Sequence, residues 1–310
     1  MTIPTPAAPP PSDETTAPLL ELRHVRKVFG GGSMFKRREV TALDDFSLCI
    51  DAERPSITAV VGESGSGKTT MARMLLGLEQ PSSGEVLYRG TELRQLSKLQ
   101  WRDYRKNVQA IFQDPFGVYN SFYKVDHVLE TPLRKFKLAG SRSEERRLME
   151  QALRQVGLEP ENTLGRYPHQ LSGGQRQRTM VARTLLLRPR MIVADEPVSM
   201  IDASLRATVL GNLLQLKRQF GISLVYITHD LTTAYQISDR IIVLYQGTVV
   251  EAGEPEQIVR SPRHSYTQLL IRSIPEPDPD QHWGEDDDEE FEQEEEPDGA
   301  LSGTVPAPGQ

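Results

Sequence analysis

The stretch that most constrains this chain is Val60–Thr70, VVGESGSGKTT, which lies between an apolar run at 57–61 and a helix-prone run at 71–76. Its pattern G-x-x-x-x-G-K-T is formed by Gly62, Gly67, Lys68 and Thr69. Glycines between a strand and a helix let backbone N–H groups turn inward around phosphate oxygens, and the helix N-terminus adds about half a positive charge. The lysine can then reach the outer phosphates and the threonine hydroxyl can bind Mg²⁺. The stretch therefore predicts a nucleoside triphosphate site.

Composition excludes several classes of protein. No run of 18 apolar residues occurs, so we expect no membrane-spanning helix, and the N-terminus lacks the basic start and apolar segment of a secretory signal. The one cysteine, Cys49, excludes an intrachain disulfide and a cysteine zinc cluster. Cys49 lies in an alternating apolar segment, where we expect a small core residue. These features are typical of a reducing, cytosolic location.

The net charge of −7 arises in a terminal segment. Residues 276–298 hold 14 Asp and Glu and no Lys or Arg, so without them the chain would carry +7. Such a run usually forms a solvated, disordered tail, although a docking or autoinhibitory role is the alternative. The Pro/Ala/Thr-rich residues 1–17 are expected to form a disordered leader. We therefore predict one folded domain at 18–275, followed by an acidic tail at 276–310.

Strands and helices are predicted to alternate along the folded part, which indicates an α/β fold. A first strand at 19–29 is expected to pair with 40–50, in which Asp44–Asp45 could form a turn. Further strands are expected at 57–61, 85–89, 108–112, 191–194, 223–227, 241–245 and 248–251. Between about 114 and 188 helical spacing replaces the strands, at 125–138, 143–156 and 172–187, so we predict a helical insertion there.

Polar residues follow three of these strands. Asp195 and Glu196 come at the end of the strand 191–194, His229 follows the strand 223–227, and Gln113 follows a third. The carboxyl ends of strands in open α/β sheets are where ligands bind. Asp195 suits the Mg²⁺ carboxylate of an ATPase, and Glu196 could act as general base towards the attacking water. The His229 imidazole could hydrogen-bond the γ-phosphate and that water. Gln113 could offer its oxygen to Mg²⁺ and donate a hydrogen bond to the same water.

The segment at 171–178, LSGGQRQR, supplies a serine and two glycines at a helix start, which is a second anion-binding nest. One nucleotide does not need two such nests from one chain. The economical interpretation is that this nest closes over the nucleotide of a second subunit.

An ordered set of segments carries a family resemblance: GESGSGKTT, Gln113, LSGGQRQR, MIVADEP, Asp202 and His229. The set is similar to the nucleotide-binding subunits of ABC transporters, and the similarity extends from about 19 to 274. It implies a P-loop NTPase ABC cassette, with a RecA-like core, an antiparallel β subdomain, a helical subdomain at about 114–188 and a C-terminal extension at about 252–275. In this family two subunits meet head to tail around two ATP.

The resemblance also implies a role for each matching residue. The phosphate loop would comprise Gly62, Ser64, Gly65, Ser66, Gly67, Lys68, Thr69 and Thr70, with Phe29 stacked on adenine. Mg²⁺ would be held by Thr69, Gln113 and Asp195, while Glu196, His229 and Gln113 would be catalytic. The opposite ATP would be bound by Ser172, Gly173, Gly174 and Gln175, and Asp202 would act across the interface.

This chain resembles the oligopeptide, dipeptide and nickel importer ATPases through the loop between Phe29 and Val40, the run IFQDPF and the C-terminal PRHSYTQLLIRSIPEP. Within that subfamily, LSGGQRQR is similar to the second of two paired ATPases. It implies a second, non-identical ATPase, two polytopic permease subunits, an indirect extracytoplasmic solute-binding protein and no nucleic acid. The location would be the cytoplasmic face of the membrane, with Tyr119, Phe122 and Tyr123 in a groove for the permease. Asn120-Ser121 replaces the usual Asn-Pro, so an oligosaccharide importer is an alternative. Another is a soluble ABC ATPase.

Overall fold

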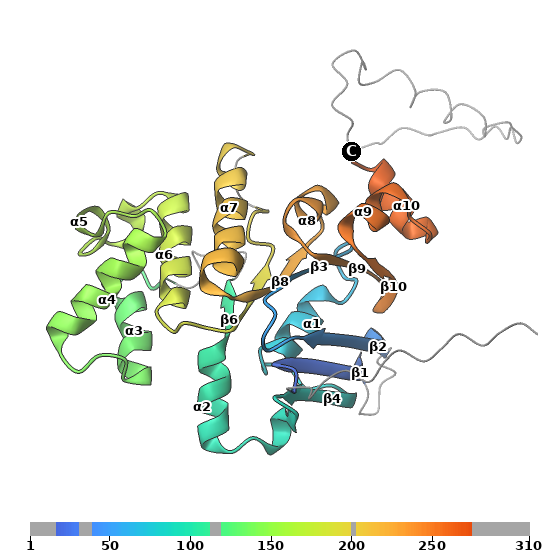
Figure 1. Ribbon diagram of the computed structural model, residues 1–310, viewed down its shortest axis with the longest axis horizontal. Helices are drawn as coiled ribbons and strands as arrows, with labels where there is room; N and C mark the ends of the chain where they lie inside the picture. The colour runs from blue at the N-terminus through green and yellow to red at the C-terminus, as the bar shows by residue number, and fades with distance from the viewer. Residues whose placement is uncertain (1–16, 31–38, 112–118, 200–202, 275–310) are drawn as a thin grey trace, which may run out of the picture. The chain divides into compact units, whose positions relative to one another are not determined.

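A computed structural model describes residues 17–30, 39–111, 119–199 and 203–274 (Figure 1). Gln113, Asp202, most of the expected leader and the acidic tail lie outside the described residues. The loop at 31–38 lies outside them as well, so the expectations for these segments stay predictions.

The larger sheet has six strands in the order β10-β9-β3-β8-β7-β6. Its strands are β3 Ile57–Val61, β6 Val108–Ile111, β7 Met191–Asp195, β8 Ser223–Thr228, β9 Arg240–Tyr245 and β10 Thr248–Gly253. All neighbours are parallel except β9 and β10, which join at a turn through Gln246 and Gly247, both with positive φ. β3 and β8 are buried along their whole length, as continuous apolar runs in a parallel sheet should be.

The strand register brings three candidate segments to one edge. Val61 pairs with Thr228, and Asp195 pairs with Ile227, so β3, β7 and β8 end together. The phosphate loop, Glu196 and His229 each follow one of these ends. The prediction that these motifs share a sheet edge is confirmed.

The second sheet is antiparallel, in the order β2-β1-β4-β5. It comprises β1 Leu20–Phe29, β2 Val40–Ile50, β4 Ser83–Tyr88 and β5 Thr91–Glu92. Helix α1, Lys68–Leu75, contacts β1 and β2 and shares an apolar core with them that includes Leu20, Phe46 and Met71. The phosphate loop and its helix are thereby held between the two sheets.

Two predictions for β2 were wrong. The strand continues through Asp44 and Asp45, where the pairing register with β1 shifts and Asp45 takes a φ of 52°, so the acidic pair forms a bulge in the strand. Cys49 is exposed, because Leu48 and Ile50 on either side of it face the core and strand side chains alternate.

The helical region between β6 and β7 contains helices at the predicted places. Helices α3 Asp126–Phe136, α4 Arg142–Gln155 and α6 Gly173–Leu185 match the predictions, with the short α5 Pro160–Thr163 and a 3₁₀ turn at Pro168–Gln170 between them (Figure 1). They pack through Leu129, Leu133, Met149, Leu153 and Val181. Helix α2, Lys98–Asn107, was not predicted.

The chain continues through α7 Ala203–Phe220 and α8 Leu231–Ile237. Two helices then follow β10, α9 Pro255–Arg260 and α10 Ser265–Arg272, within the range predicted as a C-terminal extension. Across the described ranges, none of these helices has both the length and the apolar character needed to cross a bilayer.

Candidate nucleotide-binding site

The phosphate loop joins β3 to α1, and two of its glycines are required by close contacts. A Cβ atom on Gly62 would lie 2.1 Å from the Leu244 carbonyl oxygen, and one on Gly67 would lie 2.2 Å from that of Ala42. Gly67 also has a φ of 106° at the N-cap of α1, a conformation that L side chains rarely adopt. The sequence pattern G-x-x-x-x-G is therefore fixed here by packing against both sheets.

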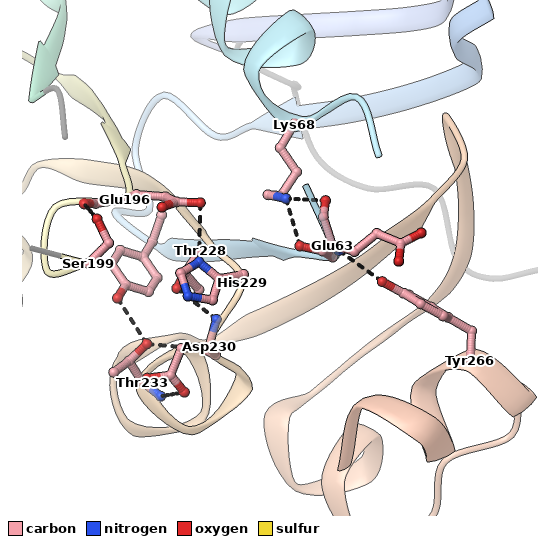
Figure 2. A network of polar contacts seen from close by, with 11 residues as sticks. Glu63, Lys68, Glu196, Ser199, Thr228, His229, Asp230, Thr233 and Tyr266 are labelled. Carbon is pink, nitrogen blue, oxygen red and sulfur yellow. Dashed lines mark hydrogen bonds and ion pairs between the residues drawn. The ribbon is translucent and has the colours of Figure 1, made fainter. Parts of the chain in front are cut away.

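Lys68 begins α1 and turns back over the loop. Its buried ammonium donates to the carbonyl oxygens of Gly62, at 2.6 Å, and Glu63, at 2.7 Å (Figure 2). Burial lowers the pKa of Lys68, while the nearby carboxylates of Glu196 and Asp195 act in the opposite direction. A cation held in a glycine loop among backbone dipoles is suited to receive a polyanion.

The residues of the loop fit a triphosphate. Ser66 is 2% exposed, and its hydroxyl has no hydrogen-bond partner among the described residues. Buried polar groups are normally paired, so an unpaired hydroxyl in the same loop as a buried ammonium indicates a place for an oxygen-rich ligand. Ser64, Gly65 and Thr69 are exposed along the same loop. A phosphate oxygen would supply the acceptor that the Ser66 hydroxyl lacks.

Asp195 ends β7 and is half-buried. Burial raises the pKa of this carboxyl, and the neighbouring charge of Glu196 adds to the rise, whereas Lys68 and Arg73 oppose it. Within the described ranges no cluster of three or more His, Cys, Asp or Glu could hold a metal ion by itself. The donors near the loop, a hydroxyl and one or two carboxylates, instead suit Mg²⁺, which is usually bound together with substrate phosphates.

Glu196 and His229 lie against each other at the sheet edge. Glu196 has a left-handed φ of 45°, its N–H donates to Ile227 at 2.9 Å, and its carbonyl accepts from the Ser199 hydroxyl at 3.0 Å. Its Oε1 lies 3.2 Å from His229 Nδ1 (Figure 2). The His229 side chain is 59% exposed and that of Glu196 is 22% exposed. The pair therefore has access to a substrate at the loop.

The residue after His229 fixes the position of the pair. Asp230 is the N-cap of α8 and accepts from the backbone N–H groups of Thr232 and Thr233. Its N–H in turn donates to Thr228 Oγ1 at 3.0 Å. The short turn that carries His229 is thus anchored on both sides.

The second nest lies on the surface at the start of α6. Ser172 is the N-cap: its hydroxyl accepts from Gln175 N at 3.2 Å, and Gln175 Oε1 accepts from Ser172 N at 2.9 Å. Ser172 and Gly173 are exposed, and a Cβ on Gly173 would meet only open space. Within α6, Gln177 donates to the Pro197 carbonyl, which joins this helix to the loop that carries Glu196.

The structure therefore brings together the phosphate loop, Asp195, Glu196 and His229. Phe29, the last residue of β1, is 41% exposed, and Lys27 Nζ lies 5.0 Å from its ring centroid, as expected of an aromatic available for stacking. Tyr119 is buried, with its hydroxyl donating to the Arg176 carbonyl, and it lines a groove together with Tyr123. Phe122 and Tyr123 are exposed.

Sequence reasoning missed two residues that position the site, Gln177 and Tyr266. The Tyr266 hydroxyl accepts from Glu63 N at 2.8 Å, a contact between residues 203 positions apart. No local pattern signals such a contact. Gln177, in contrast, lies within the LSGGQRQR segment, and its position on α6 could have been marked as buried by helical spacing.

The family model described as "ABC transporter" matches residues 43–199 of this chain. A second model, "Oligopeptide/dipeptide transporter, C-terminal region", matches residues 250–301. Together the matched ranges include the phosphate loop, the LSGGQRQR segment, the Asp195-Glu196 pair and the C-terminal helices.

Among similar proteins, the oligopeptide transport ATP-binding protein OppF of Haemophilus influenzae is 39% identical over 84% of this chain and 79% of its own length. The dipeptide transport ATP-binding protein DppF of Escherichia coli is 40% identical over 85% and 78%. A solved dimeric structure of the ATP-binding cassette MJ0796, bound to ADP and Pi, is 29% identical with a TM-score of 0.65, covering 76% of this chain and 98% of that one. With its two sheets, helical region and phosphate loop, this chain belongs to the ABC transporter family as an ATP-binding, ATP-hydrolysing cassette.

Proposed function

We propose that this chain is the ATPase subunit of an importer of oligopeptides or dipeptides. The observation that carries the proposal is the position of the Glu196–His229 pair at the same sheet edge as the phosphate loop. The names of the relatives and the match of residues 250–301 to the peptide-transporter C-terminal region support the solute class.

The chain's own residues suit the steps of hydrolysis. Lys68 would exchange the carbonyls of Gly62 and Glu63 for phosphate oxygens, which are stronger acceptors because they are charged. Glu196 would accept the proton of the water that attacks the γ-phosphorus, and His229 would hold Glu196 and hydrogen-bond the γ-phosphate. Hydrolysis then yields ADP and inorganic phosphate.

We propose Mg²⁺ as the cofactor, held by the Thr69 hydroxyl and by Asp195. Gln113, which lies outside the described residues, is proposed as a further ligand and catalytic group. When bound, the ion would neutralise charge on the phosphates. The site otherwise supplies one buried ammonium for a triphosphate of higher negative charge.

A complete site is proposed to need a second ATPase subunit. Ser172, Gly173, Gly174 and Gln175 would bind the ATP held by the partner, because this nest is exposed on the surface. The dimeric MJ0796 cassette supports two-subunit assembly. Asp202, outside the described residues, would act across the interface, and we propose that the partner is non-identical, as in the second-ATPase type.

The remaining partners are two polytopic permease subunits, which would place this chain at the cytoplasmic face of the membrane, and an extracytoplasmic solute-binding protein that acts indirectly. The exposed Phe122 and Tyr123 suit an interface with the permease, since aromatic residues are enriched in such interfaces. We propose domain boundaries at 18–275, with the helical subdomain at about 114–188 and the C-terminal extension at about 252–275.

The substitution Glu196→Gln tests the catalytic proposal. It removes the proton acceptor while keeping size and hydrogen bonding, so ATP binding should persist and turnover should fall by at least about 10²-fold. Phosphate release and binding of a fluorescent ATP analogue measure the two quantities. Glu256→Gln, an exposed change on α9, is the matched control and should leave both unchanged. Unchanged turnover in Glu196→Gln would refute the role of Glu196.

The solute class is tested on the assembled transporter. We expect the tagged chain to co-purify with two membrane subunits, and we expect this complex to take up labelled peptides into proteoliposomes when ATP is supplied. Uptake of oligosaccharides alone would favour the sugar importer. Purification without any membrane subunit would favour a soluble ABC ATPase.

A further inference from the structure

We infer that Tyr266, on the C-terminal helix α10, is a positioning residue for the phosphate loop. This inference rests on the proposed function, because it assigns to Tyr266 the task of holding the loop while ATP is bound. The sequence analysis gave this tyrosine no role.

The contact is direct. The Tyr266 hydroxyl accepts a hydrogen bond from the backbone N–H of Glu63 at 2.8 Å, and Figure 2 shows the side chain reaching from α10 to the loop. Glu63 immediately follows Gly62, the first glycine of the loop. The Tyr266 residue is 8% exposed, and the hydrogen bond is partly buried because Glu63 itself lies at the surface.

The ring of Tyr266 is held on the larger sheet. It packs against Tyr245 at the end of β9, with ring centroids 4.2 Å apart and an interplanar angle of 31°. Strand β9 is the neighbour of β3, which leads into the loop. The ring contact therefore fixes the hydroxyl relative to the same sheet edge that carries the loop.

The start of α10 is also fixed. The Glu251 carboxylate in β10 accepts from Arg263 N at 2.9 Å and from His264 N at 3.1 Å. His264 Nδ1 in turn accepts from Tyr266 N at 3.2 Å as the N-cap of the helix. Burial raises the pKa of the Tyr266 phenol, so the hydroxyl stays neutral at ordinary pH. These contacts preorganise Tyr266 before any ligand arrives.

The importance of this contact should increase when ATP binds. Both backbone polar groups of Glu63 are restrained, because Tyr266 accepts from its N–H while Lys68 Nζ donates to its carbonyl at 2.7 Å. When the Lys68 ammonium moves to the phosphates, the carbonyl loses that donor. Tyr266 then remains as the side-chain restraint on Glu63, so it should favour the nucleotide-bound loop in particular.

A purely structural role for Tyr266 makes a different prediction. Tyr266 belongs to the apolar core together with Ile258 and Ile241, so its ring alone could serve to anchor α10. In that case the hydroxyl would not affect nucleotide binding. The substitutions Tyr266→Phe and Tyr266→Ala separate the two roles, since only the second removes the ring.

The experiment measures the dissociation constant of a fluorescent ATP analogue for the full-length chain carrying Tyr266→Phe. We expect a rise of about three- to tenfold, the scale of one lost hydrogen bond, with the apparent KM for ATP rising in parallel and kcat changing less. Hydrogen exchange followed by mass spectrometry should show faster exchange in the peptide that contains Glu63. The larger cavity made by Tyr266→Ala should add a loss of thermal stability.

Tyr88→Phe is the matched control. Tyr88 is also buried, its hydroxyl donates to Asp103 at 2.7 Å, and it lies in the antiparallel sheet. It should lower stability without changing ATP binding. Unchanged ATP affinity and unchanged exchange at Glu63 in Tyr266→Phe would overturn the inference, even if the wild-type chain hydrolyses ATP. Failure of the wild type to hydrolyse ATP in the assembled transporter would instead overturn the proposed function, and the binding measurement would still decide the role of Tyr266.

Discussion

The phosphate loop and the LSGGQRQR segment each form a glycine-containing nest at a helix start, and their surroundings differ. The phosphate loop is packed between two sheets, with a buried ammonium at Lys68 and a buried Ser66 hydroxyl that has no partner in the described part of the chain. The LSGGQRQR nest lies on the surface, and its Ser172 hydroxyl accepts from Gln175 N in a capping box. The phosphate loop therefore has buried donors, Lys68 and Ser66, that can turn to a ligand, whereas the LSGGQRQR nest forms an ordinary exposed helix start.

This difference indicates how each nest can bind phosphate. Low local dielectric strengthens the electrostatic contacts of the buried Lys68 ammonium and Ser66 hydroxyl, so we expect the phosphate loop to bind a triphosphate by itself. An exposed serine N-cap competes with water and gains little from an anion until a second surface covers it. The proposal that the second nest serves a partner's ATP follows from this contrast, and each prediction below tests one side of it.

The largest effect is expected at the buried nest. Lys68→Met keeps the length of the side chain but removes the ammonium that would reach the phosphates. Hydrogen bonds to charged groups contribute about 1.5–3 kcal/mol each, so loss of two should weaken ATP binding by at least about 10²-fold. Equilibrium binding of a fluorescent ATP analogue to the isolated chain measures the change in affinity.

Lys217→Met is the control for this change, because it removes a lysine that pairs with Asp239 outside the loop. It should leave the affinity for ATP unchanged. A Lys68→Met chain that bound ATP normally would show that the buried nest does not hold the phosphates.

A smaller and more selective effect is expected at the exposed nest. Ser172→Ala should leave ATP binding by the isolated chain unchanged, because the phosphate loop is intact. In the assembled transporter, turnover should fall about tenfold or more if Ser172 has its proposed role, since the hydroxyl proposed to contact the partner's charged phosphate is lost. Phosphate release by the assembly and analogue binding by the isolated chain give the two readouts.

Ser97 provides a matched control within the same chain. It caps α2 with the same capping box, accepting from Gln100 N at 3.3 Å, and lies outside both nests. Ser97→Ala and Ser172→Ala should each cost about 1 kcal/mol of stability through the lost cap. Equal turnover of the two variants would mean that Ser172 acts only as a helix cap.

The same contrast explains what could be predicted from the sequence. Strands β3, β7 and β8 were predictable because each is a short, mainly apolar run that leads into a motif. Helix α2 could have been found from its capping box, Ser97 with Gln100, although its sequence KLQWRDYRKN offers only a weak apolar face. Local signals were sufficient wherever local structure decides the outcome.

The errors and omissions lie where distant segments decide the outcome. Cys49 is exposed because β2 directs Leu48 and Ile50 to the core, and the alternation alone does not say which face is covered. Tyr119 is buried because α6 supplies the Arg176 carbonyl as an acceptor. The link from Tyr266 to Glu63 joins segments 203 positions apart. Such contacts are set by the packing of the whole domain.

The smallest effect is expected at Asp195, beside the buried nest. Burial and the charge of Glu196 raise the pKa of this carboxyl above its ordinary value, so ionising it opposes folding. Asp195→Asn removes that charge and should raise the melting temperature by roughly 1–3 °C near neutral pH, while ATP turnover falls because a proposed Mg²⁺ ligand is lost.

The pH dependence of this gain follows from the direction of the pKa shift. The unfavourable contribution is fully present above the folded-state pKa and disappears as the pH falls through it, because the protonated wild-type carboxyl then resembles the amide of Asn. The difference in melting temperature between Asp195→Asn and wild type should therefore be larger near pH 7 than near pH 4, as measured by thermal unfolding. A variant less stable than wild type near pH 7 would show that the ionised Asp195 carboxylate stabilises the fold. The raised pKa would then not reflect a net cost of its charge in the folded chain.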